Sequence, residues 1–314
     1  MTTFVIRRLV SVIPVLFLVA IFAFVLVHLT PGDPASYMLG PLASEQQVHD
    51  LREVLGLNEP VYVQFGRWFV RVLHGNLGES IFMSIPVPLA IWQRLEPTLL
   101  LTLLAVLVEV LVGVSAGIAA ATHRNTWIDQ AIMTFASLGL STPSFWLGLN
   151  LIFLFGVHLR LLPVAGYVPL SESWVGAIRS LVMPAFALGF ISSALVARMT
   201  RSSILEVLSQ DFVRTARAKG VAEKGVVWRH AMRNAILPVM TVVGNSFASL
   251  LGGLVVTEQV FAIPGVGLLV INSVLHRDYP VIQGVLLYIV TLYVFINVAV
   301  DILYALADPR IKFS

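Results

Sequence analysis

The sequence predicts an all-α polytopic membrane protein with six transmembrane helices and with both termini in the cytoplasm. Three observations support this fold class. Hydrophobic residues make up 58% of the 314 residues and charged residues only 12%, about half the share that soluble domains carry. Long uncharged segments recur at lengths that can cross a bilayer. Basic residues are concentrated in alternate connections between these segments.

The first apolar segment, residues 9–29, directly follows Arg7 and Arg8. It is longer than the apolar core of a cleavable signal peptide, which has about 7–15 residues. We therefore expect a retained helix preceded by an orienting arginine pair, with a twin-arginine export signal as the alternative. The later spans are predicted over residues 98–121, 131–157, 180–197, 235–257 and 281–300.

The distribution of basic residues orients the chain. With a cytoplasmic N-terminus, the inner segments 1–8, 122–128, 198–234 and 301–314 hold 13 Lys and Arg in 66 residues. The outer segments 30–97, 158–180 and 258–281 hold 7 in 115 residues. Because cytoplasmic loops carry the excess of Lys and Arg, both termini are predicted to be cytoplasmic.

The chain divides into an N-terminal transmembrane helix (1–29), an extracytoplasmic helical loop region (30–97) and a transmembrane core (98–314). In the loop region, Ser44 followed by Gln47 has the spacing of a capping box. Gly56 is placed to end the same helix. We expect two or three short helices there and no strands.

The core contains a strongly basic cytoplasmic loop, 198–234, with eight Lys and Arg. Its sequence "DFVRTARAKGVAEKGVVWRHAMRNAILPV" predicts a short helix over 212–219, a corner at Gly220 and a second helix from Glu223 that runs into the membrane. Binding to anionic lipid explains the charge, whereas docking to a soluble partner also explains the alanines, the glycine and the apolar residues. The candidate docking residues are Arg214, Thr215, Ala216, Arg217, Lys219, Gly220, Val226 and Trp228.

This loop resembles the cytoplasmic loop of permease subunits of ABC-type peptide importers, which have the type I importer fold. The resemblance extends over nearly the whole chain, through "HLTPGDPA", "LGLNEP", "HGNLGES", "STPSFWLG", "ARMTRSSILEVL", "FAIPGVG", "RDYPVIQG" and "DILYALADPRI" in the same order. The general importer loop has Glu-Ala-Ala, three residues and Gly. Here Arg214, Thr215 and Ala216 stand at the first three positions, so only the last alanine and the glycine are kept.

The resemblance implies a permease subunit that forms half of a translocation pathway in the bacterial inner membrane. Its implied partners are a second, different permease, two cytoplasmic ABC ATPases and an extracytoplasmic solute-binding protein. The loop would dock into a groove on an ATPase, and "FAIPGVG" would lie beneath the binding protein. The implied substrates are dipeptides or oligopeptides, with glutathione and nickel complexes as alternatives.

Other functions lack their motifs. The dipeptide Gly-Lys is absent, so the chain has no P-loop lysine, and any ATP is used by partner subunits. The absence of cysteine excludes disulfides, cysteine–metal sites and a cysteine nucleophile. No catalytic motif and no metal-ligand spacing occur. We therefore predict no enzyme activity, no cofactor or metal on this chain, and no nucleic-acid partner.

Polar residues within the predicted spans are candidates for transport. Glu109 lies in the middle of a span, where an acid is either paired or protonated against a neighbouring helix or takes part in transport. The candidate pathway residues are Ser141, Thr142, Asn245, Ser246 and Ser249. Close packing of helices is the alternative explanation for these small polar residues.

Two other function classes stay open. A self-sufficient secondary transporter would show inverted repeats and buried coupling-ion sites, and a membrane enzyme would show a cluster of polar residues near one interface. The sequence shows no repeat and no such cluster. Neither class requires a docking element such as the loop 198–234, which therefore discriminates between them and the importer.

Overall fold

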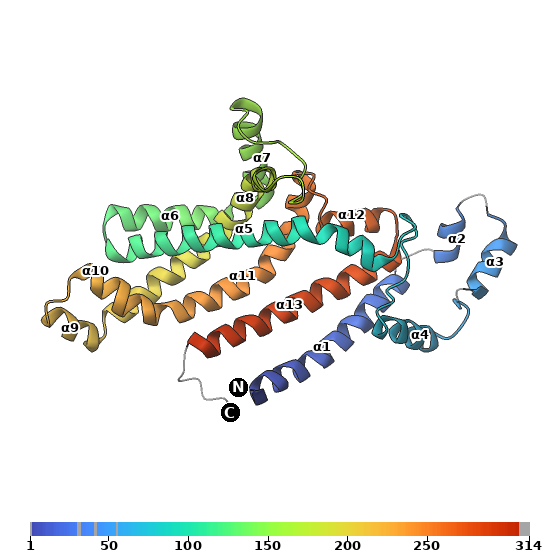
Figure 1. Ribbon diagram of the computed structural model, residues 1–314, viewed down its shortest axis with the longest axis horizontal. Helices are drawn as coiled ribbons and strands as arrows, with labels where there is room; N and C mark the ends of the chain where they lie inside the picture. The colour runs from blue at the N-terminus through green and yellow to red at the C-terminus, as the bar shows by residue number, and fades with distance from the viewer. Residues whose placement is uncertain (1, 30–32, 41–42, 55, 308–314) are drawn as a thin grey trace. The chain divides into compact units, whose positions relative to one another are not determined.

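The computed structural model describes residues 2–29, 33–40, 43–54 and 56–307, and nearly all of them are helical (Figure 1). The described residues contain no β-strand, only an isolated bridge between Glu79 and Pro86. Contacts divide the chain into two units. The first comprises 1–95 and 269–298, and the second comprises 96–268 and 299–314.

The first unit is built from short helices packed against apolar spans. Its elements are α1 (Thr2–Leu29), α2 (Pro34–Leu39), α3 (Glu45–Val54), α4 (Val61–Leu73), the start of α5 (Val87–Thr122), the end of α12 (Val266–Leu275) and most of α13 (Tyr279–Ala307). Phe24 of α1 and Trp68 of α4 form its buried centre, with ring centroids 5.6 Å apart. The amphipathic α4 therefore packs its aromatic face against α1.

The capping box predicted in this unit is confirmed. The Ser44 amide donates to Gln47 Oε1 at 2.9 Å, and the Gln47 amide donates to Ser44 Oγ at 3.3 Å. After α3, Gly56 adopts a φ of +69°, as an αL residue at a helix end does. Three short helices, α2 to α4, are found in the described part of the loop region.

The helix that contains the predicted span 98–121 begins earlier than that span, because α5 starts at Val87 and carries Pro97 inside it. A proline within a membrane helix is tolerated when neighbouring groups satisfy the freed carbonyl. Pro97 therefore lies inside the helix and does not mark its start.

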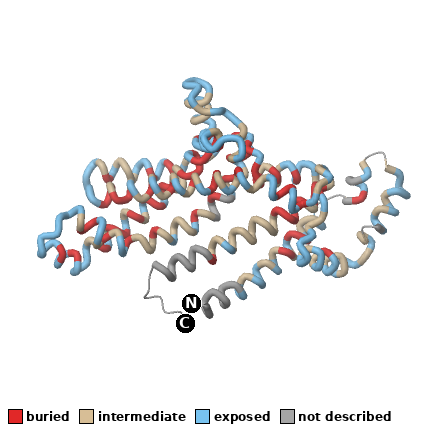
Figure 2. Tube along the Cα trace, in the orientation of Figure 1, coloured by how far each residue is buried: buried red, intermediate tan, exposed pale blue. Residues whose placement is uncertain are grey.

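The second unit is a bundle around α8. Its elements are α5 from residue 96, α6 (Trp127–Ser141), α7 (Ser144–Leu151), the π-helical turn η1 (Ile152–His158), α8 (Trp174–Leu208), α9 (Asp211–Ala218), α10 (Glu223–Gly225), the π-helical turn η2 (Val226–Ala231), α11 (Met232–Val260) and the first turn of α12. Buried residues follow α8 along most of its length (Figure 2).

Glycines bring α5 and α8 into close contact. A Cβ built on Gly113 would lie 2.7 Å from Val196, and one built on Gly117 would lie 2.5 Å from Thr200. On α8, Gly189 lies against the carbonyl of Ala105, 2.3 Å from where its own Cβ would be. Small residues allow membrane helices to approach this closely.

Among the described residues, four helices are long and apolar enough to cross a membrane, and up to six spans result if each of two bent pairs counts as one. The predicted span 131–157 is not one straight helix, because α6 and α7 with η1 meet at an angle of 103°. Thr142 is extended before Pro143 (φ −93°, ψ 126°), as expected for a residue that precedes proline. The second pair, which includes α11, bends by 57°.

Candidate functional site

The predicted cytoplasmic loop folds as two short helical segments joined by a tight corner. Helix α9 ends at Ala218, and Gly220 follows with a φ of +78°. The Gly220 amide donates to the Arg217 carbonyl at 2.9 Å, and the Val221 amide donates to the Ala216 carbonyl at 3.2 Å. These two bonds define a Schellman motif, which requires the left-handed conformation at Gly220. The predicted corner is confirmed.

An ion pair links the helices on the two sides of this corner, α9 and α10. Arg217 Nη2 lies 2.6 Å from Glu223 Oε1, and Arg217 Nε lies 3.1 Å from Glu223 Oε2. Hydrogen bonding to Glu223 raises the pKa of Arg217, so the guanidinium stays charged. Both side chains are about half exposed, so the pair contributes little to stability. Its bidentate geometry nevertheless fixes α9 relative to α10.

The inner face of the loop is apolar and packs onto the bundle. Val213 and Ala231 are buried together with Val226 and Val227. The side chains they cover are Ile118 and Ala121 of α5 and Ile204 and Val207 of α8. The loop is thus part of the folded bundle.

Two predicted positions need correction. The sequence analysis placed Val226 among the docking residues, but its side chain is 0% exposed, and Val227 beside it is buried too. The π-helical turn η2 widens the helix here and directs Val226, Val227 and Ala231 toward the bundle. Ala216 is also buried and serves as a packing residue.

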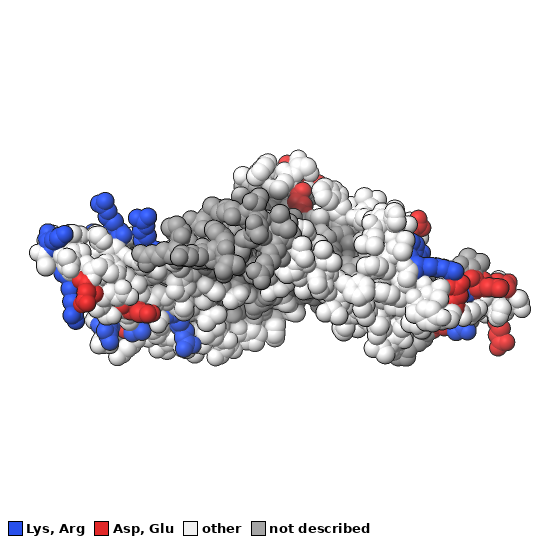
Figure 3. All heavy atoms as spheres, turned by 90° about the horizontal axis from the view of Figure 1, so that it is seen from below, with Lys and Arg blue, Asp and Glu red and all other residues white. Residues whose placement is uncertain are grey.

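The outer face of the loop is basic and exposes Trp228, and Phe212 at the start of α9 is 40% exposed. Trp228 is 62% exposed although its two preceding neighbours are buried. Lys and Arg side chains gather around α9 and α10 (Figure 3). The exposed residues of this face, hereafter the outer face of the loop, are Arg214, Thr215, Arg217, Lys219, Gly220, Lys224, Trp228 and Arg229.

A buried ion pair next to this loop was missed by the sequence analysis. Arg201 of α8 donates to both carboxylate oxygens of Asp129 in α6, from Nε at 2.6 Å and from Nη2 at 2.7 Å. Asp129 also accepts the Asn125 amide at 3.0 Å and so fixes the turn between α5 and α6. An acid at the start of a predicted span was the only sequence signal.

Among the described residues Glu109 has no basic partner, whereas the expectation of a protonated carboxyl against a neighbouring helix stays a prediction. It is completely buried in α5, and neither carboxylate oxygen has a hydrogen-bond partner among the described residues. Ser246 of α11 lies close enough to interact with it, but the Ser246 hydroxyl donates to the Val243 carbonyl at 2.8 Å.

The candidate pathway residues lie along α6 and α11 and do not form one cluster. Ser141 and Thr142 lie at the break before α7, and each hydroxyl donates to a carbonyl of its own helix. Asn245 is exposed and Ser246 is buried. The side chain of Ser249 lies outside the described residues. The role of all five in a pathway stays a prediction.

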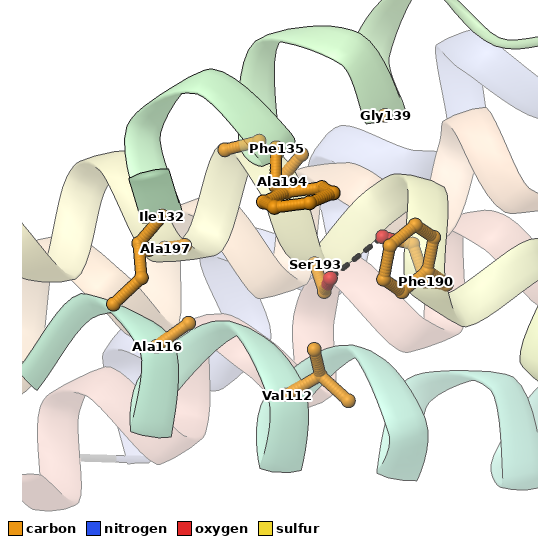
Figure 4. A pocket seen from close by; sticks show the side chains of 10 residues that line it. Val112, Ala116, Ile132, Phe135, Gly139, Phe190, Ser193, Ala194 and Ala197 are labelled. Atoms are coloured by element: carbon orange, nitrogen blue, oxygen red, sulfur yellow. Dashed lines mark hydrogen bonds between the residues drawn. The ribbon is translucent and has the colours of Figure 1, made fainter. Parts of the chain in front are cut away.

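A groove of about 150 Å³ lies between α5, α6 and α8 (Figure 4). Apolar side chains and glycine line it, and Phe135 and Phe190 are its largest residues. Its one hydroxyl, on Ser193, donates to the Phe190 carbonyl at 2.6 Å. The groove therefore offers a polar solute no free side-chain donor, and the Ser193 oxygen is its one side-chain acceptor.

Residues 113–313 match the family model of the binding-protein-dependent transport system inner membrane component. Residues 1–88 match the model of the N-terminal part of such membrane components. The chain belongs to this family. It is the multi-pass inner-membrane permease of a binding-protein-dependent transport system, and the resemblance to ABC importer permeases is confirmed.

Relatives of this permease match it over its full length. It is 47% identical over 314 residues to a putative peptide transport system permease protein of Brucella abortus (strain 2308), with 100% of both chains covered. It is 44% identical over 314 residues, again with 100% of both chains covered, to the glutathione transport system permease protein GsiC of Salmonella paratyphi A. A structure of the MetNI methionine ABC transporter matches 70% of this chain and 96% of its own, with a TM-score of 0.59 and 17% identity, and shows the shared fold.

The two family models correspond to distinct parts of the permease. The N-terminal model covers α1 to α4, and the second begins at Gly113 within α5 and includes the loop with its corner at Gly220. The ion pair of Asp129 with Arg201 lies within the second matched region. The candidate site therefore belongs to the part of the chain that the transport-component family shares.

Proposed function

We propose that this permease forms half of an ATP-driven translocation pathway for peptides or peptide-like solutes that an extracytoplasmic binding protein delivers. The names of full-length relatives support the substrate class, since they include peptide and glutathione transport permeases. Glutathione is itself a peptide, so it falls within the same proposal. ATP hydrolysis belongs to separate subunits, and the complex contains a second permease and two ATPases.

The observation that carries the proposal is the construction of the loop. Its inner face is buried against α5 and α8, whereas the outer face of the loop exposes Trp228 among basic residues. A patch that served only to bind lipid headgroups would need charge alone. A helix pair with a fixed corner, a buried inner face and an exposed aromatic side chain is suited to docking in a protein groove.

We further propose that the outer face of the loop contacts the ATPase and that the loop transmits its movement. The Schellman motif and the Arg217–Glu223 ion pair fix the angle between α9 and α10. Because η2 continues directly into α11, displacement of α9 moves α11 without first deforming the corner. ATP then biases the equilibrium between inward and outward access through contacts that differ between the two states.

The proposed arrangement has six spans, cytoplasmic termini and residues 30–97 as an extracytoplasmic region. The absence of cysteine makes it directly testable, since every introduced thiol is unique. In intact cells, a membrane-impermeant maleimide should label the Glu172→Cys variant and leave the Lys224→Cys variant unlabelled until the membrane is opened. Both positions are exposed. Labelling of Lys224→Cys in intact cells would reverse the proposed orientation.

Docking is tested by affinity purification of the complex from detergent-solubilised membranes. The Gly220→Pro variant cannot adopt the φ of +78° and loses the amide bond to Arg217. Gly75→Pro is a matched control, because Gly75 has a φ of +77° and its amide donates to Val72 in the same kind of motif after α4. We expect the ATPase to be lost from Gly220→Pro and kept by Gly75→Pro.

Purification of the unmodified chain without an ATPase, together with uptake into ATP-free vesicles, would contradict the proposal. That result would favour a self-sufficient secondary transporter. Equal loss of the ATPase from both glycine variants would show that a disturbed fold, and not the corner, explains the effect.

A further inference from the structure

The corner between α11 and α12 is organised around one buried acid. Glu258 lies in the last turn of α11 and is completely buried. Its Oε1 accepts the Thr98 hydroxyl of α5 at 2.6 Å, and its Oε2 accepts the Leu268 amide of α12 at 2.9 Å. The Thr98 oxygen in turn accepts the Val266 amide at 2.8 Å. Three helices are therefore joined through a single carboxylate.

The same carboxylate explains the two glycines of "FAIPGVG". A Cβ on Gly265 would lie 2.1 Å from Glu258 Oε1, and a Cβ on Gly267 would lie 2.9 Å from Oε2. Both distances are far shorter than any van der Waals contact. The carboxylate occupies the space that a side chain at Gly265 would need. At Gly267 the Val255 Cα, 2.8 Å from a built Cβ, excludes a side chain together with the carboxylate.

The corner also contacts the other irregular segments at this end of the second unit. The ring of Phe261 lies against Gly148 of α7, where a Cβ would be 2.9 Å away. The Phe261 carbonyl accepts the Gly166 amide at 2.8 Å, which ties the loop before α8 to the corner. Two residues before Thr98, Glu96 of α5 accepts the Tyr167 hydroxyl from that loop at 2.6 Å.

Helix α11 connects this corner to the basic loop. It begins at Met232, directly after η2, and ends two residues after Glu258. Measured along its axis, an α-helix of 29 residues is about 43 Å long, and α11 bends by 57° between Phe247 and Gly252. Glu258 and the outer face of the loop therefore lie at opposite ends of one element.

We propose that Glu258 is a positioning residue of the transport cycle. Its carboxylate fixes the start of α12, the 261–265 corner and the end of α11 to α5, so that these segments, which lie beyond the 57° bend of α11, move as one group when the basic loop displaces α11. The inference rests on the proposed function, since it requires an ATPase that acts on the loop. Thr98 is the second member of the arrangement, because it bridges the carboxylate and the α12 backbone.

The test uses the complete importer reconstituted in proteoliposomes with its binding protein, and it measures solute uptake per ATP hydrolysed. Glu258→Gln keeps the shape but places an amide N–H₂ where an acceptor is needed, and Thr98→Val removes the hydroxyl. Thr98→Ser keeps the hydroxyl, and Gln259→Ala changes the exposed neighbour of Glu258. A buried hydrogen bond that is lost in only one of the two access states shifts the equilibrium between these states by about tenfold.

We expect uptake per ATP to fall about tenfold in Glu258→Gln and Thr98→Val and to stay at the wild-type value in Thr98→Ser and Gln259→Ala. A lower ratio in the complexes that assemble supports the proposal whatever their abundance. A wild-type ratio in Glu258→Gln, with or without a loss of thermal stability, overturns it and leaves Glu258 a structural residue. Failure of the wild-type chain to assemble with an ATPase overturns the proposed function as well, and is recognised before any variant is measured.

Discussion

Arg201 donates hydrogen bonds to both oxygens of the Asp129 carboxylate, at 2.6 and 2.7 Å, and this ion pair joins the start of α6 to the cytoplasmic end proposed for α8. The Asp129 side chain is 5% exposed and that of Arg201 is 26% exposed. The same carboxylate holds the Asn125 amide of the preceding turn. The pair lies near the end of α8, shortly before α9 begins. It therefore stabilises the part of the bundle against which α9 and η2 pack.

Removal of Asp129 is expected to destabilise the permease strongly. Asp129→Ala leaves the Arg201 guanidinium partly buried without its counter-ion, which costs about 3 kcal/mol. Thermal unfolding of the purified protein in detergent measures the effect. Asp50→Ala is the control, since Asp50 is an exposed acid of α3. Equal melting temperatures for the two variants would contradict the importance of the ion pair.

The close contact of α5 and α8 predicts opposite effects for two glycine substitutions. Gly117→Ala places a Cβ 2.5 Å from Thr200 and should destabilise the fold by about 1–3 kcal/mol. The Cβ that Gly66→Ala adds in the middle of α4 would have no neighbouring heavy atom within 4 Å. This substitution should stabilise the fold by about 0.5–1 kcal/mol. Chemical or thermal unfolding of both variants gives the signs. Destabilisation by both would indicate that the helix contact is not responsible.

Replacement of Glu109 by glutamine is expected to leave transport largely intact. The carboxyl is buried without a hydrogen-bond partner among the described residues, and an unpaired charge there would be costly. A neutral carboxyl and an amide have nearly the same shape, so Glu109→Gln preserves the packing. Uptake is compared with membrane abundance by immunoblot. Loss of uptake at normal abundance would show that Glu109 takes part in transport.

Trp228 is expected to be a major contact of the proposed ATPase. Tryptophan is enriched among interface residues whose truncation costs at least about 2 kcal/mol, which corresponds to roughly 30-fold in affinity. Trp228→Ala should therefore weaken ATPase binding by about this factor. Trp174→Ala is the matched control, because Trp174 is 70% exposed at the start of α8 and lies far from the loop in sequence. Unchanged binding in Trp228→Ala, measured on detergent-solubilised complexes, would exclude it as an anchor.

Local sequence signals predicted the features that depend on a few neighbouring residues. The capping box of Ser44 and Gln47 and the corner at Gly220 each depend on hydrogen bonds within six residues. Apolar segment length also located the helices that are long enough to span. The family resemblance, carried by ordered motifs, was confirmed by the match over 113–313.

Features that depend on distant residues were not predicted. Asp129 and Arg201 are 72 residues apart, and Thr98 and Glu258 are 160 apart. The burial of Val226 depends on the widened turn of η2, which no local propensity signals. Pro143 lies inside the predicted span 131–157, but a proline alone does not distinguish a kink from the 103° angle that the structure contains.

The filled space at Gly265 and Gly267 has an evolutionary consequence. A larger residue at Gly265 collides with the Glu258 carboxylate, and a shortened Glu258 leaves the Leu268 amide without its acceptor. At Gly267 the Val255 backbone, 2.8 Å from a built Cβ, excludes a side chain whatever residue stands at position 258. Homologous sequences that lack the acid should therefore tolerate a larger residue at position 265 and keep the glycine at 267.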